Sequence, residues 1–202
     1  MTNNVEKVLR SLDDIGEIFR KQQKKQQKEA LAQEPVFNPF EFMKNDEMGI
    51  SRLIAFLLDP KASHRQDRIF LDNFLKQIDC YEYLCYDTSC VSVEKTLKNS
   101  GRRHDILIEG RLKGKIVWVI SIENKLCGAS DQPKQVADYV EDIKKYVKDI
   151  ENPRYLLLYL HPNGDEPSED SISNKEWKSL LQDKHVRPID ANFITHAVKL
   201  RP

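Results

Sequence analysis

Asp105, Glu123 and Lys125 are the residues whose types and spacing are best suited to chemistry in this chain. Glu123 and Lys125 follow a largely apolar segment, residues 116–122, that reads as a buried strand. Side chains two positions apart share one face of a strand. Asp105 starts the preceding apolar segment, and a short turn containing glycine joins the two. Antiparallel pairing across such a turn brings the start of one strand beside the end of the other. We therefore expect the three side chains to converge.

This convergence would bring together the groups needed to hydrolyse a phosphodiester. Asp105 and Glu123 are the predicted metal ligands, because Mg²⁺ prefers oxygen ligands, keeps several waters and binds substrate phosphate. The backbone carbonyl of Asn124 can complete the set, and Mn²⁺ is the expected substitute. Lys125 is placed to orient or deprotonate an attacking water, or to stabilise the pentavalent phosphate. The alternative is a structural salt bridge, since buried charges need partners.

The elements around this segment predict one α/β domain that can hold such a site. Periodic apolar residues predict helices over residues 46–59, 66–78 and 132–149, around 177–181, and from about 192. Apolar runs predict strands over residues 90–94, 104–109, 115–123, 154–160 and 186–189. The 115–123 strand is apolar at almost every position, which is typical of a central strand covered on both faces. The order of elements predicts a mixed β-sheet flanked by α-helices.

The N-terminal region has a different pattern. Residues 4–32 predict one long helix whose apolar stripe stops at Phe19, and Pro35 and Pro39 mark a linker after it. We therefore expect an amphipathic helix with its linker over residues 1–39 and a separate domain over residues 40–202. The apolar stripe could form a homodimer contact or pack on its own domain. The polar residues after Phe19 fit a solvated helix end better than a basic arm near nucleic acid.

The motif and its surroundings resemble the PD-(D/E)xK nuclease superfamily. The segments RRHDILIEG and VISIENK supply the Asp and the Glu-x-Lys of its motif, with His104 in place of the proline. Two longer stretches, NDEMGISRLIAFLLDP and IENKLCGASDQPKQVADYV, resemble an uncharacterised bacterial branch of the superfamily. The resemblance covers residues 46–160, with weaker agreement to about residue 198. It implies a restriction-endonuclease-like α/β fold, with the N-terminal helix as an extension outside it, and a metal-dependent nuclease activity.

The resemblance also implies supporting residues on two helices. In that branch an early helical glutamate often joins the site, and Glu47 is the matching position. The alternative for Glu47 is an ordinary first-turn glutamate favoured by the helix dipole. Gln135-x-x-x-Tyr139 resembles the helical motif of RecB-like nucleases, and the two side chains share a helix face. Glu47 and Gln135 are therefore predicted as catalytic residues, and Tyr139 as a substrate contact or a core residue.

Charged residues beside the motif complete the candidate site. Arg102 and Arg103 flank the motif aspartate and are predicted to clamp a substrate phosphate, with a solvated strand start as the alternative. Glu94, near the end of its strand, fits a solvated sheet edge better than the site. His104 is given no catalytic role.

Composition predicts a cytoplasmic protein with no membrane segment. No apolar run approaches the roughly 20 residues that a membrane span needs, and the N-terminus carries no hydrophobic signal segment. The 32 basic and 32 acidic residues give a formal net charge of zero. Any nucleic-acid contact must therefore come from a local basic patch.

Two functions of different class follow. The first is an Mg²⁺-dependent nuclease whose partner is nucleic acid, and the family resemblance favours DNA over RNA. The second is a catalytically inactive module with the same fold, used for nucleic-acid binding or protein assembly. The intact Asp105, Glu123 and Lys125 favour the enzyme, whereas neutral charge and the N-terminal helix keep the second hypothesis open.

Overall fold

The structure, a computed structural model, describes residues 46–193. Its elements, in chain order, are α2 (Glu47–Leu58), α3 (Ile69–Gln77), the 3-10 helix η2 (Tyr81–Leu84), β1 (Thr88–Thr96), β2 (Arg103–Leu112), β3 (Lys115–Asn124), α4 (Gln135–Tyr146), β4 (Arg154–Leu160), α5 (Asn174–Gln182) and β5 (Val186–Ile189). Each helix and strand predicted within residues 46–189 is present, and η2 was not predicted. The predicted helix over residues 4–32, its linker and most of the last helix lie outside the described residues.

The five strands form one mixed sheet in the order β1-β2-β3-β4-β5, with β3 in the middle. Strands β1, β2 and β3 pair antiparallel, whereas β3, β4 and β5 pair parallel. The expected hairpin of β2 and β3 is confirmed, and it pairs Ile106 with Ile122. This register brings the residues next to them, Asp105 and Glu123, opposite one another at the end of the hairpin.

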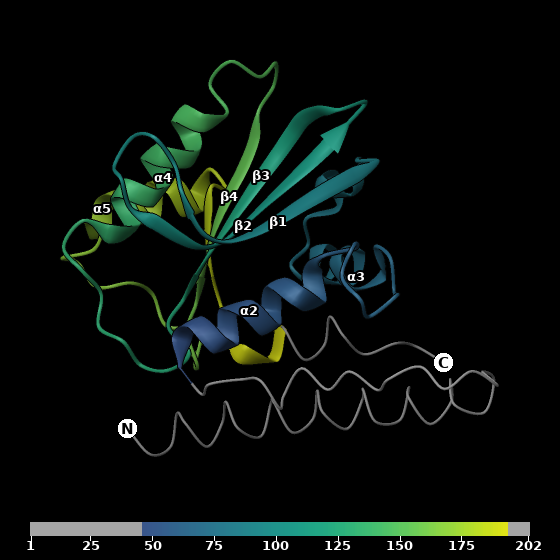
Figure 1. The fold of residues 1–202 in the computed structure, drawn as a ribbon. Helices are drawn as coiled ribbons and strands as arrows, with labels where there is room; N and C mark the ends of the chain where they lie inside the picture. Colours follow the sequence, from purple (N-terminus) through teal and green to yellow (C-terminus); the bar gives the residue numbers. More distant parts are fainter. Residues whose placement is uncertain (1–45, 194–202) are drawn as a thin grey trace.

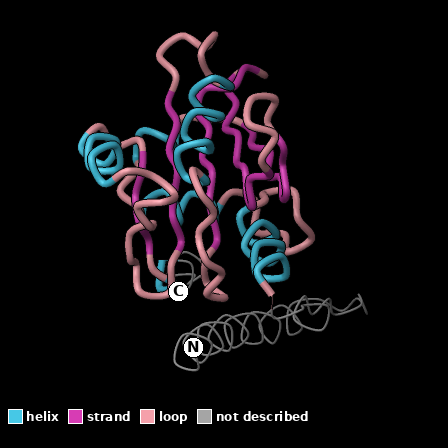
Figure 2. Tube along the Cα trace, turned by 90° about the vertical axis from the view of Figure 1, so that its left-hand side faces the viewer, coloured by secondary structure: helices cyan, strands magenta, loops and turns pink. Residues whose placement is uncertain are grey.

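Helices cover both faces of the sheet, which confirms the predicted sandwich (Figures 1 and 2). One face packs on α2, α3 and η2, using Ile120 and Ile122 of β3. The other face packs on α4 and α5, using Val119 of β3. Both cores thus take residues from β3, as expected for a central strand buried on two faces. No helix among residues 46–193 is long and apolar enough to cross a membrane.

The helices that reach the site begin in different ways. Asp46 caps α2 as expected, because its Oδ1 accepts a hydrogen bond from the backbone N–H of Gly49 at 2.7 Å. Helix α4 begins at Gln135, three residues later than predicted. Its preceding residue, Lys134, has left-handed backbone angles, with φ at 58°, and makes no side-chain cap within the described chain. The start of α4 therefore depends on partners from elsewhere in the fold.

Candidate active site

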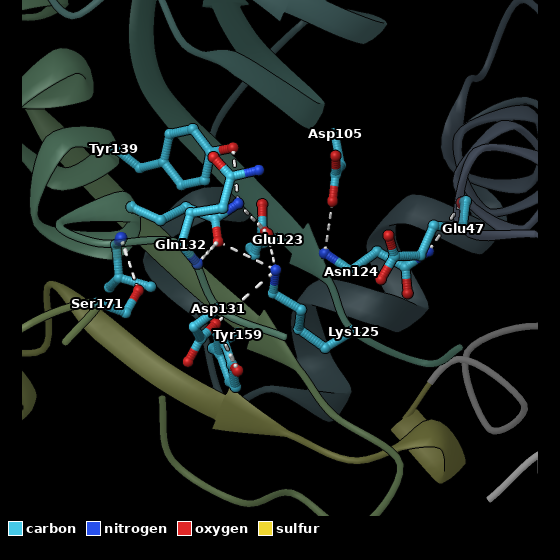
Figure 3. A network of polar contacts seen from close by, with 12 residues as sticks. Glu47, Asp105, Glu123, Asn124, Lys125, Asp131, Gln132, Tyr139, Tyr159 and Ser171 are labelled. Atoms are coloured by element: carbon cyan, nitrogen blue, oxygen red, sulfur yellow. Dashed lines mark hydrogen bonds and ion pairs between the residues drawn. The ribbon is translucent and has the colours of Figure 1, made fainter. Parts of the chain in front are cut away.

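Asp105 and Glu123 meet where β3 ends, as their positions in the hairpin predict (Figure 3). The backbone N–H of Asn124 donates to Oδ2 of Asp105 at 2.8 Å, which fixes the aspartate against the end of β3. Burial raises the pKa of Asp105 above its ordinary value, although the hydrogen bond from Asn124 partly opposes this effect. The carboxylate of Asp105 is thus held in place, but its negative charge is not fully compensated by its neighbours.

Glu123 is only 2% exposed, and its two carboxylate oxygens have different surroundings. Oε1 accepts hydrogen bonds from Lys125 Nζ at 2.9 Å and from Gln135 Nε2 at 2.7 Å. Oε2 is buried and meets no hydrogen-bond donor within residues 46–193. Burial, reinforced by the charge of Asp105, raises the pKa of Glu123 to about 8, even though Lys125 acts in the opposite direction.

Lys125 lies at the centre of this polar network (Figure 3). Its backbone N–H donates to the carbonyl of Leu160 at 2.8 Å, which ties the residue to the end of β4. Its ammonium donates to Glu123 and also to Oε1 of Gln135 at 3.0 Å, and it stands 3.8 Å from Oδ1 of Asp131. Burial lowers the pKa of Lys125, but the neighbouring carboxylates outweigh burial and raise it.

Asn124 attaches the first turn of α2 to the site. Its Nδ2 donates to the carbonyl of Glu47 at 3.1 Å and to Oγ of Ser51 at 3.0 Å. Its Oδ1 accepts from the backbone N–H of Leu126 at 3.1 Å. These bonds bring Glu47 to the same end of β3, where burial, assisted by Asp105, raises the pKa of the Glu47 carboxyl. Oε1 of Glu47 is buried and has no hydrogen-bond partner in the part of the chain that the structure describes.

These carboxyl groups fit a divalent cation. Glu47, Asp105 and Glu123 all have a raised pKa, because burial disfavours their charged forms, and the charge of Asp105 raises the pKa of Glu47 and Glu123 further. A bound cation would relieve both effects, and the unpartnered oxygens of Glu47 and Glu123 are the hard donors that Mg²⁺ and Mn²⁺ accept. Residues 46–193 contain no ready group of three or more acidic, histidine or cysteine side chains around one metal position. Backbone carbonyls and water would therefore supply the remaining ligands.

Gln135 and Tyr139 brace the network from α4. Gln135 is 6% exposed and connects the carboxylate of Glu123 with the ammonium of Lys125 through its two amide atoms. Tyr139 is 4% exposed, and its hydroxyl donates to the carbonyl of Arg103 at 2.9 Å and lies 3.3 Å from the amide nitrogen of Gln135. The placement of Tyr139 favours bracing, and its predicted contact with substrate stays a prediction.

The two predicted phosphate-binding arginines lie in different environments. The guanidinium of Arg102 donates to Asp138 at 2.6 Å, to Gln132 Oε1 at 3.0 Å and to the carbonyl of Pro133 at 2.6 Å, which ties β2 to the start of α4. The side chain of Arg103 is 67% exposed and pairs with Glu94 at 2.8 Å. Arg103 is therefore the more accessible of the two.

Some contacts around the site were not predicted from the sequence. Glu94 lies on the edge strand β1, as expected, with its side chain 29% exposed, and its charge also acts on Asp105. Its left-handed φ of 54° interrupts the regular course of β1. His104 is fully buried: its Nδ1 is 2.8 Å from Oγ of Ser121, and its ring lies 4.6 Å from that of Tyr139. The signal for this cluster was Asp142, an acidic residue within the apolar stripe of α4. Its carboxylate is buried and accepts hydrogen bonds from the loop before β2.

Comparison with known proteins agrees with the geometry. A family model described as the PD-(D/E)XK nuclease superfamily matches residues 37–199. Neither the curated proteins nor the solved structures include a match to this chain. The matched segment holds most of the chain, including both halves of the motif and the helices on either side of the sheet. The chain belongs to the PD-(D/E)XK nuclease superfamily.

Proposed function

We propose that the protein is a nuclease that uses a divalent metal, Mg²⁺ or Mn²⁺, to hydrolyse phosphodiester bonds in DNA. One observation carries the proposal: Glu123 has a buried, unpartnered oxygen, its carboxyl is close to Asp105, and it stands two residues before a buried lysine. Superfamily membership supports the reaction class, since fold alone does not define a function. The choice of DNA rests on the family resemblance.

Each residue of the site has a distinct task in this proposal. Asp105, Oε2 of Glu123 and the carbonyl of Asn124 would hold the metal, and the unpartnered oxygen of Glu47 would be a further candidate donor. The bound metal would supply a Lewis acid for the phosphate and a more acidic water. Lys125 uses two of its three N–H groups on Glu123 and Gln135, so one remains for the phosphate or the attacking water. Its raised pKa favours the stabilising role over that of a base.

The same proposal assigns substrate binding to Arg103. Its side chain is exposed, and its partner Glu94 can be displaced at low cost because exposed ion pairs contribute little. A guanidinium can donate two parallel hydrogen bonds to a phosphate of the substrate. Because the overall charge is zero, such local contacts must supply the attraction.

A cleavage assay tests the proposal. Linear, supercoiled and single-stranded DNA and RNA would be incubated with Mg²⁺, Mn²⁺ or EDTA, using wild type, Lys125→Ala and Asp105→Ala. We expect metal-dependent DNA cleavage that falls by about a hundredfold or more in both variants, comparable to the loss of other transition-state contacts. Lys145→Ala, at an exposed lysine of α4, is the matched control and should cleave normally.

Three outcomes would contradict the proposal in different ways. Cleavage that persists in Lys125→Ala and Asp105→Ala would show that the site is wrongly assigned. Cleavage of RNA alone would keep the reaction class and reject DNA as substrate. An absence of cleavage, together with no Mg²⁺ binding by calorimetry, would instead support an inactive module of the same fold.

A further inference from the structure

Asp131 lies in the loop between β3 and α4 and faces the ammonium of Lys125 (Figure 3). Its side chain is 6% exposed, although it belongs to a loop. Oδ1 accepts a hydrogen bond from the hydroxyl of Tyr159 at 3.0 Å, and Oδ2 accepts one from the backbone N–H of Ser168 at 2.7 Å. Both oxygens are thus fixed by neutral donors, and the side chain has a single orientation.

The charge of Asp131 is compensated by Lys125. Tyr159 and Ser168 donate hydrogen bonds but bring no charge, and a buried carboxylate is costly without a cation. The distance of 3.8 Å from Lys125 Nζ is that of an ion pair without a hydrogen bond. Asp131 therefore attracts the ammonium without occupying one of its N–H groups, which remains free.

The segment that holds Asp131 also holds the start of α4. The backbone N–H of Lys134 donates to the carbonyl of Asp170 at 2.7 Å, and that of Val136 donates to Oγ of Ser171 at 3.1 Å. These bonds satisfy N–H groups that Lys134 does not cap. Residues 168–171 therefore position Gln135 and Asp131 together, and these are two of the three partners of Lys125.

We propose that Asp131 is a positioning residue, which holds the catalytic lysine through charge and connects it to residues 168–171. Glu123 has a second task as a metal ligand, so its attraction for Lys125 weakens when a cation binds. Asp131 lies outside the proposed metal ligands and keeps its full attraction. The inference rests on the proposed function for the role of Lys125 in catalysis, whereas the electrostatic contact itself does not depend on it.

Two substitutions separate the charge of Asp131 from its hydrogen bonds. Asp131→Asn removes the charge and one acceptor, whereas Tyr159→Phe removes one hydrogen bond and leaves the charge. We expect Asp131→Asn to lower kcat by about tenfold to a hundredfold with little change in KM, as for a small displacement of a catalytic group. We expect Tyr159→Phe to remain within about threefold of wild type. Asp165→Asn, at an exposed carboxylate, is the matched control and should retain wild-type kcat.

Activity in Asp131→Asn equal to that of Tyr159→Phe would overturn the proposal, since hydrogen bonding alone would then account for Asp131. A loss that appears in KM and leaves kcat unchanged would also overturn it. Asp131→Glu keeps the charge, so it should recover part of the lost kcat. If Asp131→Asn folds poorly, the kcat of Asp131→Glu decides between the two readings. A kcat above that of Asp131→Asn supports the proposal, and a kcat no higher than that of Asp131→Asn overturns it.

A double-mutant cycle on unfolding tests the contact without any cleavage assay. Urea unfolding in EDTA would compare Asp131→Asn, Lys125→Met and the double variant. We expect the effects to be non-additive, with Asp131→Asn costing less stability once Lys125 is replaced. Additive effects would overturn the proposal, and Asp165→Asn with Lys125→Met is the additive control. If the wild type cleaves nothing, the proposed function fails while the cycle still decides whether Asp131 holds Lys125.

Discussion

Replacing Glu123 with glutamine is expected to stabilise the metal-free protein at alkaline pH, although it removes a proposed metal ligand. The carboxyl of Glu123 is 2% exposed and close to Asp105, and one of its oxygens meets no donor within the described residues. Its charged form is therefore disfavoured in the folded state. Glutamine has nearly the same shape and resembles the protonated form, so it avoids that cost at every pH.

The magnitude follows from the pKa of Glu123, which is raised from 4.5 to about 8. Between these values the folded protein holds a proton that the unfolded chain has released. The free energy of unfolding therefore falls as pH rises through this window. At about 1.4 kcal/mol per pKa unit, the raised pKa of Glu123 lowers the free energy of unfolding by about 3–5 kcal/mol at pH 9 and by under about 1 kcal/mol at pH 5. The free energy of unfolding of Glu123→Gln should exceed that of wild type by these amounts.

Urea unfolding in EDTA at pH 5, 7 and 9 measures the difference. Glu109→Gln is the matched control, because Glu109 is equally buried but both of its oxygens are bonded, to Arg111 at 2.6 Å and to Tyr146 at 3.0 Å. Glu109→Gln should be destabilised at all three pH values. Saturating Mg²⁺ should stabilise wild type and leave Glu123→Gln nearly unchanged. A Glu123→Gln protein less stable than wild type at pH 9 in EDTA would refute the reasoning.

Three other substitutions test the packing behind the site by urea unfolding. Burial lowers the pKa of the His104 imidazole to about 4, so the free energy of unfolding of wild type should fall by about 3 kcal/mol between pH 6.5 and pH 4. The free energy of unfolding of His104→Asn should lack this fall, and an equal pH dependence in both proteins would contradict the prediction. Gly110→Ala would place a Cβ 1.9 Å from Cε2 of the buried Trp118 and should cost about 3 kcal/mol, so an unchanged midpoint would disprove the close approach. Ser171→Ala removes the acceptor for the N–H of Val136 and should cost about 1 kcal/mol, whereas no change would mean that this cap is dispensable.

The placement of Asp105, Glu123 and Lys125 at one end of β3 could be predicted because short-range rules determine it. Strand alternation and a short hairpin place Asp105 opposite Glu123, and the apolar pattern of residues 116–122 marks β3 as central. Asp46 could be assigned as a helix cap from its type and position alone. All these features depend on residues that are close in sequence or on opposite strands of one hairpin.

The bracing network could not be predicted in the same way. Asp131 meets Ser168 across 37 positions, and His104 is near Asp142 across a similar separation. The first contact requires the parallel pairing of β3 with β4, which returns the chain to the end of β3 after α4. The second requires α4 to pack on the face of the sheet. No local pattern around Ser171 shows that it completes the start of α4. The positions of supporting residues therefore emerge only from tertiary structure.

The arrangement around Glu123 explains why this distant support matters. Lys125 and Gln135 both bind Oε1 of the Glu123 carboxylate, and Oε2 meets no donor within the described residues. Gln135 is in turn placed by the start of α4, which residues 170 and 171 complete through hydrogen bonds. The orientation of the Glu123 carboxylate, with one oxygen bonded and the other without a donor among the described residues, therefore depends on contacts from outside the segment between Asp105 and Lys125.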